Sequence, residues 1–484
     1  MNKVINQVLP KDWKLTTLKK ITQLIDKVKP ANEPDSEILY LDIGGIDKNT
    51  NTVIDFKHYI GKNAPSRAQQ RIKKGDVAFA NVRPYLRNIA IVPKELDEQV
   101  GSTGFCFLRP VDGISNKYIY YWVLSNAFIN DITKFQKGSS YPAVTNKQIL
   151  DRNIPLAPYD QQQQIVAKIE ELFSHIDAGV VALQKAKQLL KQYRQSVLKA
   201  AVTGELTREW REQNKDKIEP ASELLKRILA ERRSKWEEQQ LEQFKAQGKV
   251  PKDDKWKKNY KEPVAYDFNG ELPKIPKEWI WVSPEQIAHT DDYSLAIGPF
   301  GSNLKVSDYK DGGVPLVFVR NIRTHYYGQV NAKYVSPEKA QELHAHSIKG
   351  GDLLITKMGE PPGEASIYPQ NNNEIAIITA DCIKWRLSSE IKCSSLFVHT
   401  INSSFLRDQI VDRTKGVAQK KISLGTFKTL AFPLPPLEEQ QEILNLVDQK
   451  LIANERLTKS INARLIQAER HKQSILSFAF SGNL

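Results

Sequence analysis

A long internal repeat constrains this 484-residue chain more than any other feature of its sequence. The stretch IPLAPYDQQQQIVAKIEE at 154–171 returns as FPLPPLEEQQEILNLVDQ at 432–449, so that Pro155 matches Pro433 at an offset of 278 positions. The same offset carries Ile165 to Ile443 and Gly204 to Gly482, without an insertion across about seventy residues. Because an internal repeat decides the architecture of a chain, we expect a tandem duplication.

Each half of the duplication reads as a globular unit followed by a long helix. LPKDW at 9–13 resembles IPKEW at 275–279, and IKKGDVAFA at 72–80 resembles IKGGDLLIT at 348–356. Short β-rich runs broken by Gly, Pro and Asn predict mixed α+β globular units. The predicted divisions are a first globular unit at 1–153, a helix at 154–206, a helical and Lys-rich linker at 207–275, a second globular unit at 276–431 and a second helix at 432–484.

Apolar residues on the first helix recur in alternating steps of four and three, which is typical of a coiled-coil seam. The seam residues are Ile165, Ile169, Leu172, Ile176, Leu183, Ala186, Leu190, Tyr193 and Val197, with Gly179 out of pattern. The second helix has a more polar seam, in which Lys450, Asn454, Arg464 and His471 interrupt the apolar positions. The alternative is that both are ordinary amphipathic helices packed on their own globular units.

The order of the segments favours two helices that pair with each other. The first helix leads from the first globular unit to the second, and the second helix leaves the second unit. If an approximate two-fold axis relates the halves, the helices run antiparallel. A helix from 161 to 201 is about 60 Å long at 1.5 Å per residue, and one turn of B-DNA is about 34 Å. Both globular units are therefore expected to face one duplex.

The charge balance favours a polyanionic partner. The chain has 70 Lys and Arg against 56 Asp and Glu, a formal charge of +14, which points to nucleic acid first. No apolar run approaches the ~20 residues of a membrane span, and the first ten residues lack the apolar core of a signal peptide. We expect a soluble, cytoplasmic protein, in which Cys106, Cys382 and Cys393 are reduced thiols without structural zinc.

The sequence carries none of the common catalytic motifs. It has no GxxxxGK[ST] phosphate loop, GxGxxG turn, HExxH or GxSxG motif. The best nuclease-like set is Asp381 with Glu390 and Lys392, and the first half lacks the matching acid. We therefore predict a noncatalytic binding protein without a cofactor or metal. The alternatives are a self-contained nuclease or methyltransferase, and an adaptor that binds proteins without reading DNA.

Two clusters of residues carry the groups that read DNA. Arginine forks fit guanine edges, Asn and Gln fit adenine, and Lys or Arg hold phosphates. The predicted DNA-binding residues are Asn81, Arg83, Tyr85 and Arg87 in NVRPYLRN of the first half, and Lys305, Ser307, Arg320, Asn321, Arg323 and Lys357 in the second half. Solvated surface arginines are the alternative for any single member.

The chain resembles the specificity subunits of type I restriction-modification enzymes over nearly its whole length. The resemblance lies in NIPLAPYDQQQQIVAKIEELFSHIDAG and AFPLPPLEEQQEIL, in LKAAVTGELTREWREQN after the first helix, and in GPFGSNLKVSDY with GVPLVFVRNI in the second half. It implies that each globular unit is a target-recognition domain for one half of a bipartite double-stranded DNA site, with the helices as spacers.

The resemblance also implies partners for the chain. They are two modification subunits, which bind S-adenosylmethionine and methylate adenine, and motor-nuclease restriction subunits, which use ATP. The Pro-rich junction is then expected to repeat because it forms two identical docking surfaces for the modification subunits.

Overall fold

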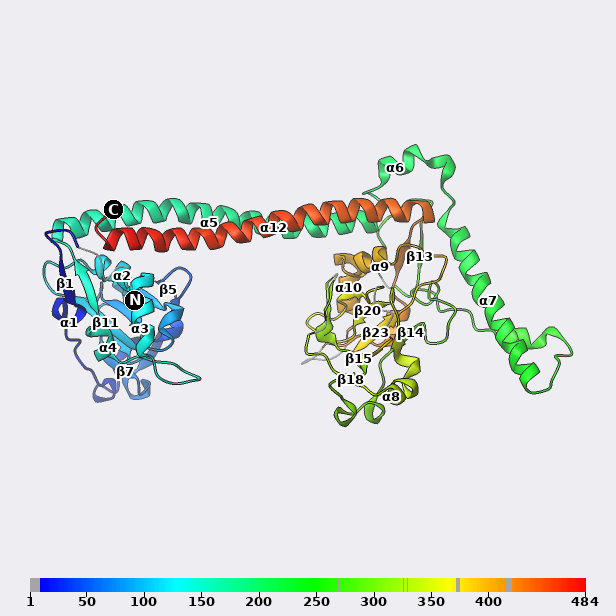
Figure 1. Ribbon diagram of the computed structural model, residues 1–484, viewed down its shortest axis with the longest axis horizontal. Coiled ribbons are helices and arrows are strands. Elements are labelled where there is room, and N and C mark those ends of the chain that lie inside the picture. Colours follow the sequence, from blue (N-terminus) through cyan, green and yellow to red (C-terminus); the bar gives the residue numbers. More distant parts are fainter. Residues whose placement is uncertain (1–8, 269, 325, 329, 371–374, 415–419) are drawn as a thin grey trace. The chain divides into compact units, whose positions relative to one another are not determined.

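The computed structural model describes residues 9–484 apart from 269, 325, 329, 371–374 and 415–419. The chain divides into two compact units, Met1–Ala186 with Lys459–Leu484, and Lys187–Thr458. Both divisions fall inside 44-residue helices, α5 (Tyr159–Val202) and α12 (Leu437–Phe480), so each unit holds a globular part and a piece of both helices (Figure 1). The first eight residues, examined above for a signal peptide, lie outside the described residues.

The globular part of the first unit is built from short strands with helices after them. Its strands are β1 (Lys14–Thr17), β2 (Thr22–Gln23), β3 (Glu37–Leu41), β4 (Ile46–Asp47), β5 (Thr52–Val53), β6 (Lys57–Ile60), β7 (Ala68–Arg71), β8 (Val77–Ala80), β9 (Ile89–Ile91), β10 (Val100–Ser102), β11 (Phe105–Pro110) and β12 (Asn153–Leu156). Its short helices are α1 (Leu18–Ile21), α2 (Asn116–Leu124), α3 (Asn126–Ile132) and α4 (Asn146–Leu150).

The second unit contains an equivalent series of strands. They are β13 (Ile280–Val282), β14 (Leu295–Ile297), β15 (Val314–Val317), β16 (Ile322–Arg323), β17 (Tyr326–Tyr327), β18 (Tyr334–Val335), β19 (Ser347–Ile348), β20 (Leu353–Thr356), β21 (Ala365–Ile367), β22 (Ala376–Ile378), β23 (Cys382–Trp385) and β24 (Phe432–Leu434). Its helices, besides parts of α5 and α12, are α6 (Arg208–Gln213), α7 (Ala221–Ala246), α8 (Pro337–Glu342), α9 (Ser394–Ile401), α10 (Ser404–Asp412) and α11 (Leu424–Lys428).

The two units share one sheet topology. The first has four-stranded sheets in the orders β6-β3-β10-β7 and β2-β11-β8-β9, and the second has β18-β15-β22-β19 and β14-β23-β20-β21. The two-stranded pairs β1-β12 and β4-β5 return as β13-β24 and β16-β17. Each strand of the first unit therefore corresponds to the strand numbered twelve higher, and β3-β10 and β15-β22 are both parallel. The described residues thus carry the duplication through the whole sheet order.

A buried ion pair repeats at the same place in both units. Asp76 precedes β8, and its carboxylate accepts two hydrogen bonds from Arg109, at 2.9 and 2.8 Å. Asp352 precedes β20 and accepts two from Arg386, both at 2.8 Å. A planar guanidinium fits a carboxylate in this bidentate way. Both aspartates lie in the repeated stretch IKxGD, so this ion pair explains part of the sequence match.

The repeated Pro-rich junction is buried inside each unit. Pro155 in β12 pairs with Leu15 of β1, and Pro433 in β24 pairs with Trp281 of β13. The first turn of each long helix then bonds back to the preceding segment, Gln162 to the carbonyl of Ala157 at 2.9 Å and Gln440 to the carbonyl of Pro435 at 3.0 Å. Both glutamines are almost fully buried. Internal packing therefore accounts for much of the junction's sequence.

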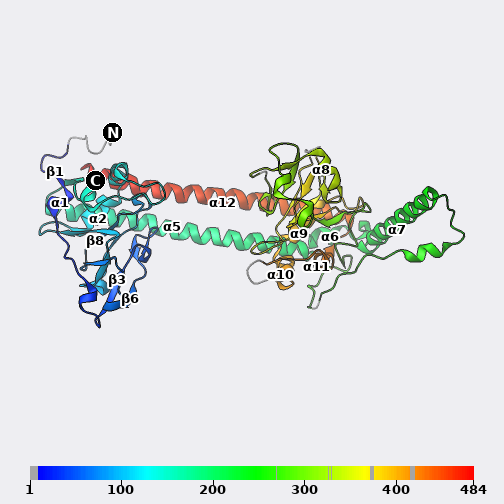
Figure 2. The same ribbon diagram turned by 90° about the horizontal axis from the view of Figure 1, so that it is seen from below.

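The long helices run antiparallel within the first unit. The end of α12 enters the core, where the Phe480 ring lies 5.0 Å from Tyr118 and 5.1 Å from Trp122 between ring centroids. Lys472 of α12 forms an ion pair with Asp177 of α5, at 2.5 Å. Figures 1 and 2 both draw this end of α12 beside the start of α5. Burial of these large aromatic rings stabilises the contact.

The second unit pairs the other halves of the two helices. Its largest core cluster contains Val197 and Leu198 of α5 together with Ile443 and Val447 of α12. Asn454, predicted to interrupt the seam, lies in it and donates a hydrogen bond from Nδ2 to the Leu190 carbonyl, at 2.8 Å. A satisfied polar group in a helical seam fixes the register of the helices.

The predicted seam of α5 is buried or half-buried at every named position except Tyr193. Val180 and Arg194 lie half-buried on α5 next to Gly179 and Tyr193, which are exposed. On α12 the predicted positions Ile443, Val447 and Asn454 are buried, Leu451 is buried beside them, and the predicted Leu457 is exposed. A straight α-helix has 3.6 residues per turn, so its inner face moves away from a strict seven-residue repeat. This drift accounts for the local departures from the predicted seams, while the predicted pairing of the helices as a coiled coil is confirmed. Arg464 and His471 lie exposed outside the seam.

Each long helix ends against a proline that precedes a globular part. A Cβ added to Gly204, after α5, would lie 2.5 Å from Cγ of Pro276, and one added to Gly482 would lie 2.2 Å from Cγ of Pro10. Both glycines have positive φ, +73° and +76°, a conformation that glycine adopts without strain. The glycines predicted as helix stops therefore also allow a close approach of two segments in each unit.

The linker between the halves is more ordered than the sequence suggests. Ala221, Leu224 and Ile228 of α7 are buried against the second unit. The Lys-rich part, predicted to be an extended tether, contains the 3-10 helix η8 (Asp254–Asn259). It returns along α7 because Trp256 stacks on Trp236 of α7, with ring centroids 5.9 Å apart.

Within the described part of the chain, no helix has both the length and the apolar character that a membrane crossing needs. The three cysteines are unpaired and buried. Burial raises the pKa of the Cys106 and Cys382 thiols to about 12.

Lys384, a buried lysine of β23, makes the stability of the second unit depend on pH. Its ammonium group donates to the carbonyls of Ala345 and Ser347, at 3.2 and 2.8 Å. Burial and the nearby Arg386 lower its pKa from 10.5 to about 8, against the opposite effect of Asp352. The unfolded chain therefore keeps a proton that the folded chain releases between pH 8 and 10.5, so stability rises across this range, by up to about 3 kcal/mol.

Lys384→Met is expected to remove this rise in the unfolding free energy. Urea unfolding of the full chain at pH 7.5 and pH 10, followed by tryptophan fluorescence, measures the difference between wild type and variant. Phe107 occupies the equivalent position of β11, so an apolar side chain fits this fold. Equal pH dependence in the two proteins would contradict the assignment to Lys384.

Candidate nucleic-acid interface

The loop after β8 carries Arg83, which is half-buried in the first unit. Buried β8 leads into a turn in which Arg83 and Arg87 both have positive φ, 49° and 54°, around the 3-10 helix η4 (Pro84–Leu86). Arg83 donates from its backbone to the Pro142 carbonyl at 2.7 Å and from Nη2 to the Ser140 carbonyl at 2.9 Å. Two left-handed residues in one turn cost free energy, so other contacts must hold the loop in shape.

Two exposed tyrosines flank this arginine. The Arg83 guanidinium lies 5.0 Å from the ring centroid of Tyr141, and Tyr141 is 72% exposed whereas Tyr85 is 47% exposed. Exposed aromatic rings beside an arginine offer stacking surface and hydrogen-bond donors together. Tyr141 was not predicted from the sequence, although its neighbourhood, KGSSYPA, is a glycine-containing loop whose Lys137 bridges to Ala143.

Arg87 has a structural role instead. It donates to the Leu124 carbonyl at 3.2 Å and to the Asn126 side chain, and it lies 3.9 Å from Glu469. Burial lowers the pKa of its guanidinium. These contacts join the loop to the start of α3 and to α12. The prediction that Arg87 binds DNA therefore lacks structural support.

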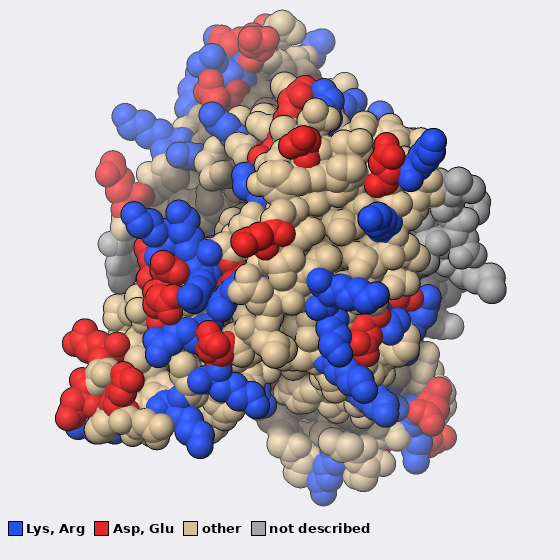
Figure 3. All heavy atoms as spheres, turned by 90° about the vertical axis from the view of Figure 1, so that its left-hand side faces the viewer, with Lys and Arg blue, Asp and Glu red and all other residues tan. Residues whose placement is uncertain are grey.

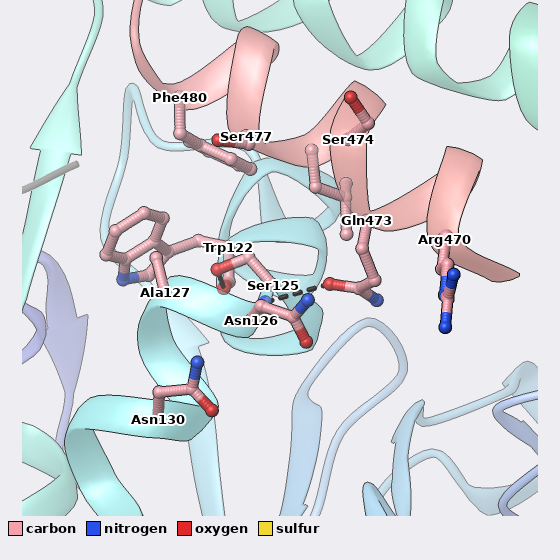
Figure 4. A pocket seen from close by; sticks show the side chains of 11 residues that line it. Trp122, Ser125, Asn126, Ala127, Asn130, Arg470, Gln473, Ser474, Ser477 and Phe480 are labelled. Atoms are coloured by element: carbon pink, nitrogen blue, oxygen red, sulfur yellow. Dashed lines mark hydrogen bonds between the residues drawn. The ribbon is translucent and has the colours of Figure 1, made fainter. Parts of the chain in front are cut away.

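A pocket of about 410 Å³ lies beside these contacts, between α3 and the end of α12. Figure 4 shows Gln473 pointing from α12 towards Asn126, whose backbone N–H donates to the Gln473 side chain at 2.8 Å. The pocket is lined by Trp122, Ser125, Asn126, Ala127, Asn130, Arg470, Gln473, Ser474, Leu476, Ser477 and Phe480. With Arg470 as its one ionisable residue, this lining has no acid–base pair for catalysis.

The loop after β20 is the counterpart of the Arg83 loop. Lys357 follows Thr356 as Asn81 follows Ala80, and both backbones make the same bonds. Asn81 donates to Gly104 and accepts from Val144, whereas Lys357 donates to Asp381 and accepts from Ile422. Lys357 Nζ lies 5.0 Å from the ring centroid of Phe300, an exposed residue of the glycine-rich loop. The same site of one fold therefore carries unlike side chains in the two units.

The predicted residues 320–323 belong to a different loop from the one that holds Arg83. They follow β15, whose counterpart is β3, and Asn321 ends the 3-10 helix η11 (Val319–Asn321). Asn321 is 3% exposed, donates to the Gly328 carbonyl and accepts from the Phe318 N–H, both at 2.8 Å. Its amide is therefore used inside the loop, which contradicts its predicted availability to adenine.

The two arginines beside Asn321 differ in exposure. Arg320 packs 3.9 Å from the Phe318 ring centroid and donates to the carbonyls of Val330 and Asn331. Arg323 donates from Nη1 to the Ile322 carbonyl at 2.9 Å, yet 55% of its side chain is exposed. It lies 4.0 Å from Glu364, at the end of the loop that begins with Lys357. Arg323 is thus the better candidate for a DNA contact.

The glycine-rich loop at 298–308 places the other two predicted residues in solvent. Lys305 and Ser307 are exposed, and the Lys305 backbone N–H donates to the Asp308 carboxylate at 2.7 Å. Through Phe300 this loop meets Lys357. Lys305, Ser307, Arg323 and Lys357 therefore lie on exposed loops of the second unit, in contrast to Asn321.

The structure offers no catalytic grouping among the described residues. Glu390 pairs with Arg227 at 3.5 Å, and Lys392 donates to the Ser389 carbonyl at 2.7 Å, so the nuclease-like set is divided among other partners. No group of three or more His, Cys, Asp or Glu in the described ranges has the placement of a metal site. Figure 3 shows basic side chains on the left-hand face of Figure 1 in groups interleaved with acidic ones, which suits local contacts better than one broad basic patch.

Comparison with known proteins decides the family. Residues 10–184 and 306–467 match the family described as the type I restriction modification DNA specificity domain, and together they span well over half of the chain. The chain belongs to this family. The family match includes parts of both halves of the duplication, and it omits 185–305.

Curated relatives of this specificity subunit carry the same description. The specificity subunit of the type I restriction enzyme EcoDI of Escherichia coli is 26% identical over 77% of this chain and 70% of its own length. That of EcoKI, from Escherichia coli strain K12, is 22% identical over 98% of this chain and 90% of its own length.

Solved structures share the fold. A chain from a structure of the type I R-M system aligns with a TM-score of 0.70 at 23% identity, covering 99% of this chain and 100% of that chain. The HsdS subunit from Thermoanaerobacter tengcongensis aligns with a TM-score of 0.50, also at 23% identity, over 99% of both chains. At this identity the likeness shows the fold alone.

The predicted family and fold class are therefore confirmed. The chain is a DNA-recognition subunit of a type I restriction-modification system, with two globular domains and a long helix between them. Specificity subunits are noncatalytic, so methylation and cleavage belong to modification and restriction partners.

Proposed function

We propose that each globular domain reads one half of a bipartite DNA site and that α5 and α12 set the distance between the halves. The single observation that carries this proposal is one sheet topology present twice with unlike loops at the same site. Shared topology supports equivalent DNA contacts, and unlike loops support different half-site sequences. The domain limits follow: 1–153 and 276–431 as target-recognition domains, 154–206 and 432–484 as spacers and 207–275 as linker.

We assign the DNA contacts by their chemistry and their position on the loops. In the first domain they are Arg83 and Tyr85, with Tyr141 added for its exposure beside Arg83. In the second domain they are Lys305, Ser307, Arg323 and Lys357. Asn81, whose Nδ2 donates to Asn146 at 2.7 Å, positions the Arg83 loop. Arginine is proposed as the base reader because its fork matches guanine.

Two modification subunits are proposed to dock on the long helices, and restriction subunits to join them. Exposed apolar residues support a protein contact there, among them Val181 and Leu189 on α5 and Ile452 and Ile466 on α12. The offset of 278 does not relate these positions to one another. The two docking surfaces are therefore proposed to be similar in place and different in detail. The complex acts on DNA, so we propose that it is cytoplasmic.

A competition experiment tests DNA reading as the function. The full chain with its modification subunits is incubated with labelled DNA from its host genome and competed with scrambled DNA at several salt concentrations. Specific sites are expected to bind ~10³-fold or more tightly than scrambled DNA. Equal competition by scrambled DNA would favour a protein adaptor without sequence reading.

Single arginines are expected to act on one half-site each. Arg83→Ala and Arg323→Ala should each weaken binding by about 1 to 3 kcal/mol through one half-site, while base changes in the other half-site keep their effect. Arg320→Ala is the matched control for Arg323→Ala, because the Arg320 guanidinium donates to the carbonyls of Val330 and Asn331 whereas 55% of the Arg323 side chain is exposed. Binding to panels of single-base variants measures this. Equal losses on every sequence, scrambled DNA included, would contradict base reading.

A further inference from the structure

The helical arm formed by α7 and η8 has no role in the family match, which stops at 184 and resumes at 306. Figures 1 and 2 show α7 extending away from the strands of the second unit. Its first turns are held by Leu224 and Ile228 in the core. Arg232 donates to the carbonyls of Glu285 and Ala288, at 3.1 and 2.9 Å, and beyond it contacts within the arm help to order the segment up to about 261.

Aromatic rings hold the arm together. Trp236 of α7 contacts Trp256 at 5.9 Å and Tyr260 at 5.3 Å, and Phe244 contacts Trp256 at 6.0 Å, all between ring centroids. Aromatic pairs of this kind stabilise by more than their buried area alone. The segment that contains η8 and returns along α7, called the return segment here, is thus fixed against α7. Its large aromatic side chains lie on the side that faces α7.

The outer side of the return segment is a row of lysines. Lys252, Lys255, Lys258 and Lys261 follow one another at intervals of three and are all exposed. In a 3-10 helix, residues three apart lie on one face, and Lys255 and Lys258 lie within η8. Lys257, by contrast, faces inward, with its ammonium 5.6 Å from the Trp256 ring centroid and 3.4 Å from Glu237.

This lysine row keeps most of its charge. Residues 245–261 contain seven lysines and two aspartates. Asp253 pairs with Lys255 at 3.2 Å, and Asp254 pairs with the inward Lys257 at 3.4 Å. Of the other nearby acids, Glu262 directly follows Lys261 and is exposed, and Glu237 lies on α7. Lys252, Lys258 and Lys261 are nevertheless exposed to solvent, and the Lys255 side chain is 83% exposed despite its partner.

We propose that this lysine row binds the phosphate backbone of DNA outside the recognised half-sites, without reading bases. Lysine is a point charge suited to phosphate, whereas base reading favours the forked groups of Arg, Asn and Gln. Protein interfaces are poor in lysine and rich in exposed aromatic residues, and here the aromatic residues lie inside the arm. The inference rests on the proposed function, because it takes the chain to be bound on DNA.

A quadruple variant tests the arm in the full chain with its modification subunits. Lys252, Lys255, Lys258 and Lys261 are changed to Ala, and binding to a recognised site with 30-base-pair flanks is measured from 50 to 200 mM salt. The slope of log K against log salt is expected to become less steep by about 3 to 4, since each phosphate contact contributes about 0.9. The loss should be equal on matched and scrambled flanks, and it should vanish when the flanks are trimmed away.

A second quadruple variant is the matched control. Lys215, Lys217, Lys226 and Lys235 are exposed lysines of the same linker, and their change to Ala removes the same charge. Equal slopes for the two variants would overturn the proposal and assign the effect to net charge. Unchanged DNA binding with loss of the modification subunits on size exclusion would assign the row to a protein partner. If wild type itself shows no sequence preference, the proposed function fails, independently of the arm.

Discussion

Arg211→Met is expected to destabilise the second unit by about 3 to 5 kcal/mol, because it leaves a buried carboxylate without its charge partner. Glu439, in the first turn of α12, is completely buried. Its carboxylate accepts hydrogen bonds from Arg211, from Thr207 at 2.5 Å and from the Trp279 indole at 2.7 Å. The segment after α5 is thereby fixed to the start of α12 within this unit.

The first half of the chain contains the neutral form of the same site. Gln161 stands where the second half has Glu439, and it accepts from the Trp13 indole at 2.9 Å. We therefore expect the double variant Arg211→Met with Glu439→Gln to recover most of the stability lost by the single change. Urea unfolding of the full chain measures the free energies. A double variant as unstable as Arg211→Met would mean that arginine packing, and not the unpaired charge, causes the loss.

Removing seven residues from each long helix is expected to change the DNA site that is recognised. Deletion of 180–186 from α5 and of 459–465 from α12 keeps the antiparallel partners matched and shortens the helices by about 10 Å. At 3.4 Å per base pair, the preferred gap between half-sites should shrink by about 3 base pairs. Binding to the original site should fall towards the nonspecific level, about 10³-fold or more.

The readout is selection of bound sequences from a randomised DNA pool with wild-type and shortened proteins. The matched control replaces the same fourteen positions by Ala and keeps both helix lengths. We expect this control to select the original gap. An unchanged gap in the shortened protein would show that the helices do not set the spacing.

The sequence predicted the duplication well because its strongest signals are local and buried. The junction residues Gln162 and Gln440 each form a hydrogen bond within their own unit. Both halves use the same residue at this place, and an alignment of the halves therefore shows the repeat. The clusters of Arg and Asn were harder to interpret. Asn81 has Lys357 as its counterpart, whereas the Arg320 cluster follows β15, the counterpart of β3, so the two predicted clusters lie on different loops of the shared fold. Equivalence of loops depends on strand order, which a single sequence does not display.

The roles of individual side chains on the loops also could not be predicted from the sequence. Arg83 and Arg87 are four residues apart and chemically identical, yet Arg87 is turned into the domain by Leu124 and Asn126. Tyr141 comes beside Arg83 through a bridge between Val82 and Ala143, which are 61 positions apart. In the linker, Trp256 appeared to be part of a solvated tether because its partner, Trp236, lies twenty residues away.

The most direct test of two readers at a fixed separation is the methylation pattern of the host genome. Long-read sequencing detects methylated adenines in the wild-type strain and in one from which this chain is deleted. The account predicts that the deletion removes one set of sites, each with two unlike short sequences separated by a constant number of unspecified base pairs. A lost set with one continuous sequence, or with a variable gap, would contradict it.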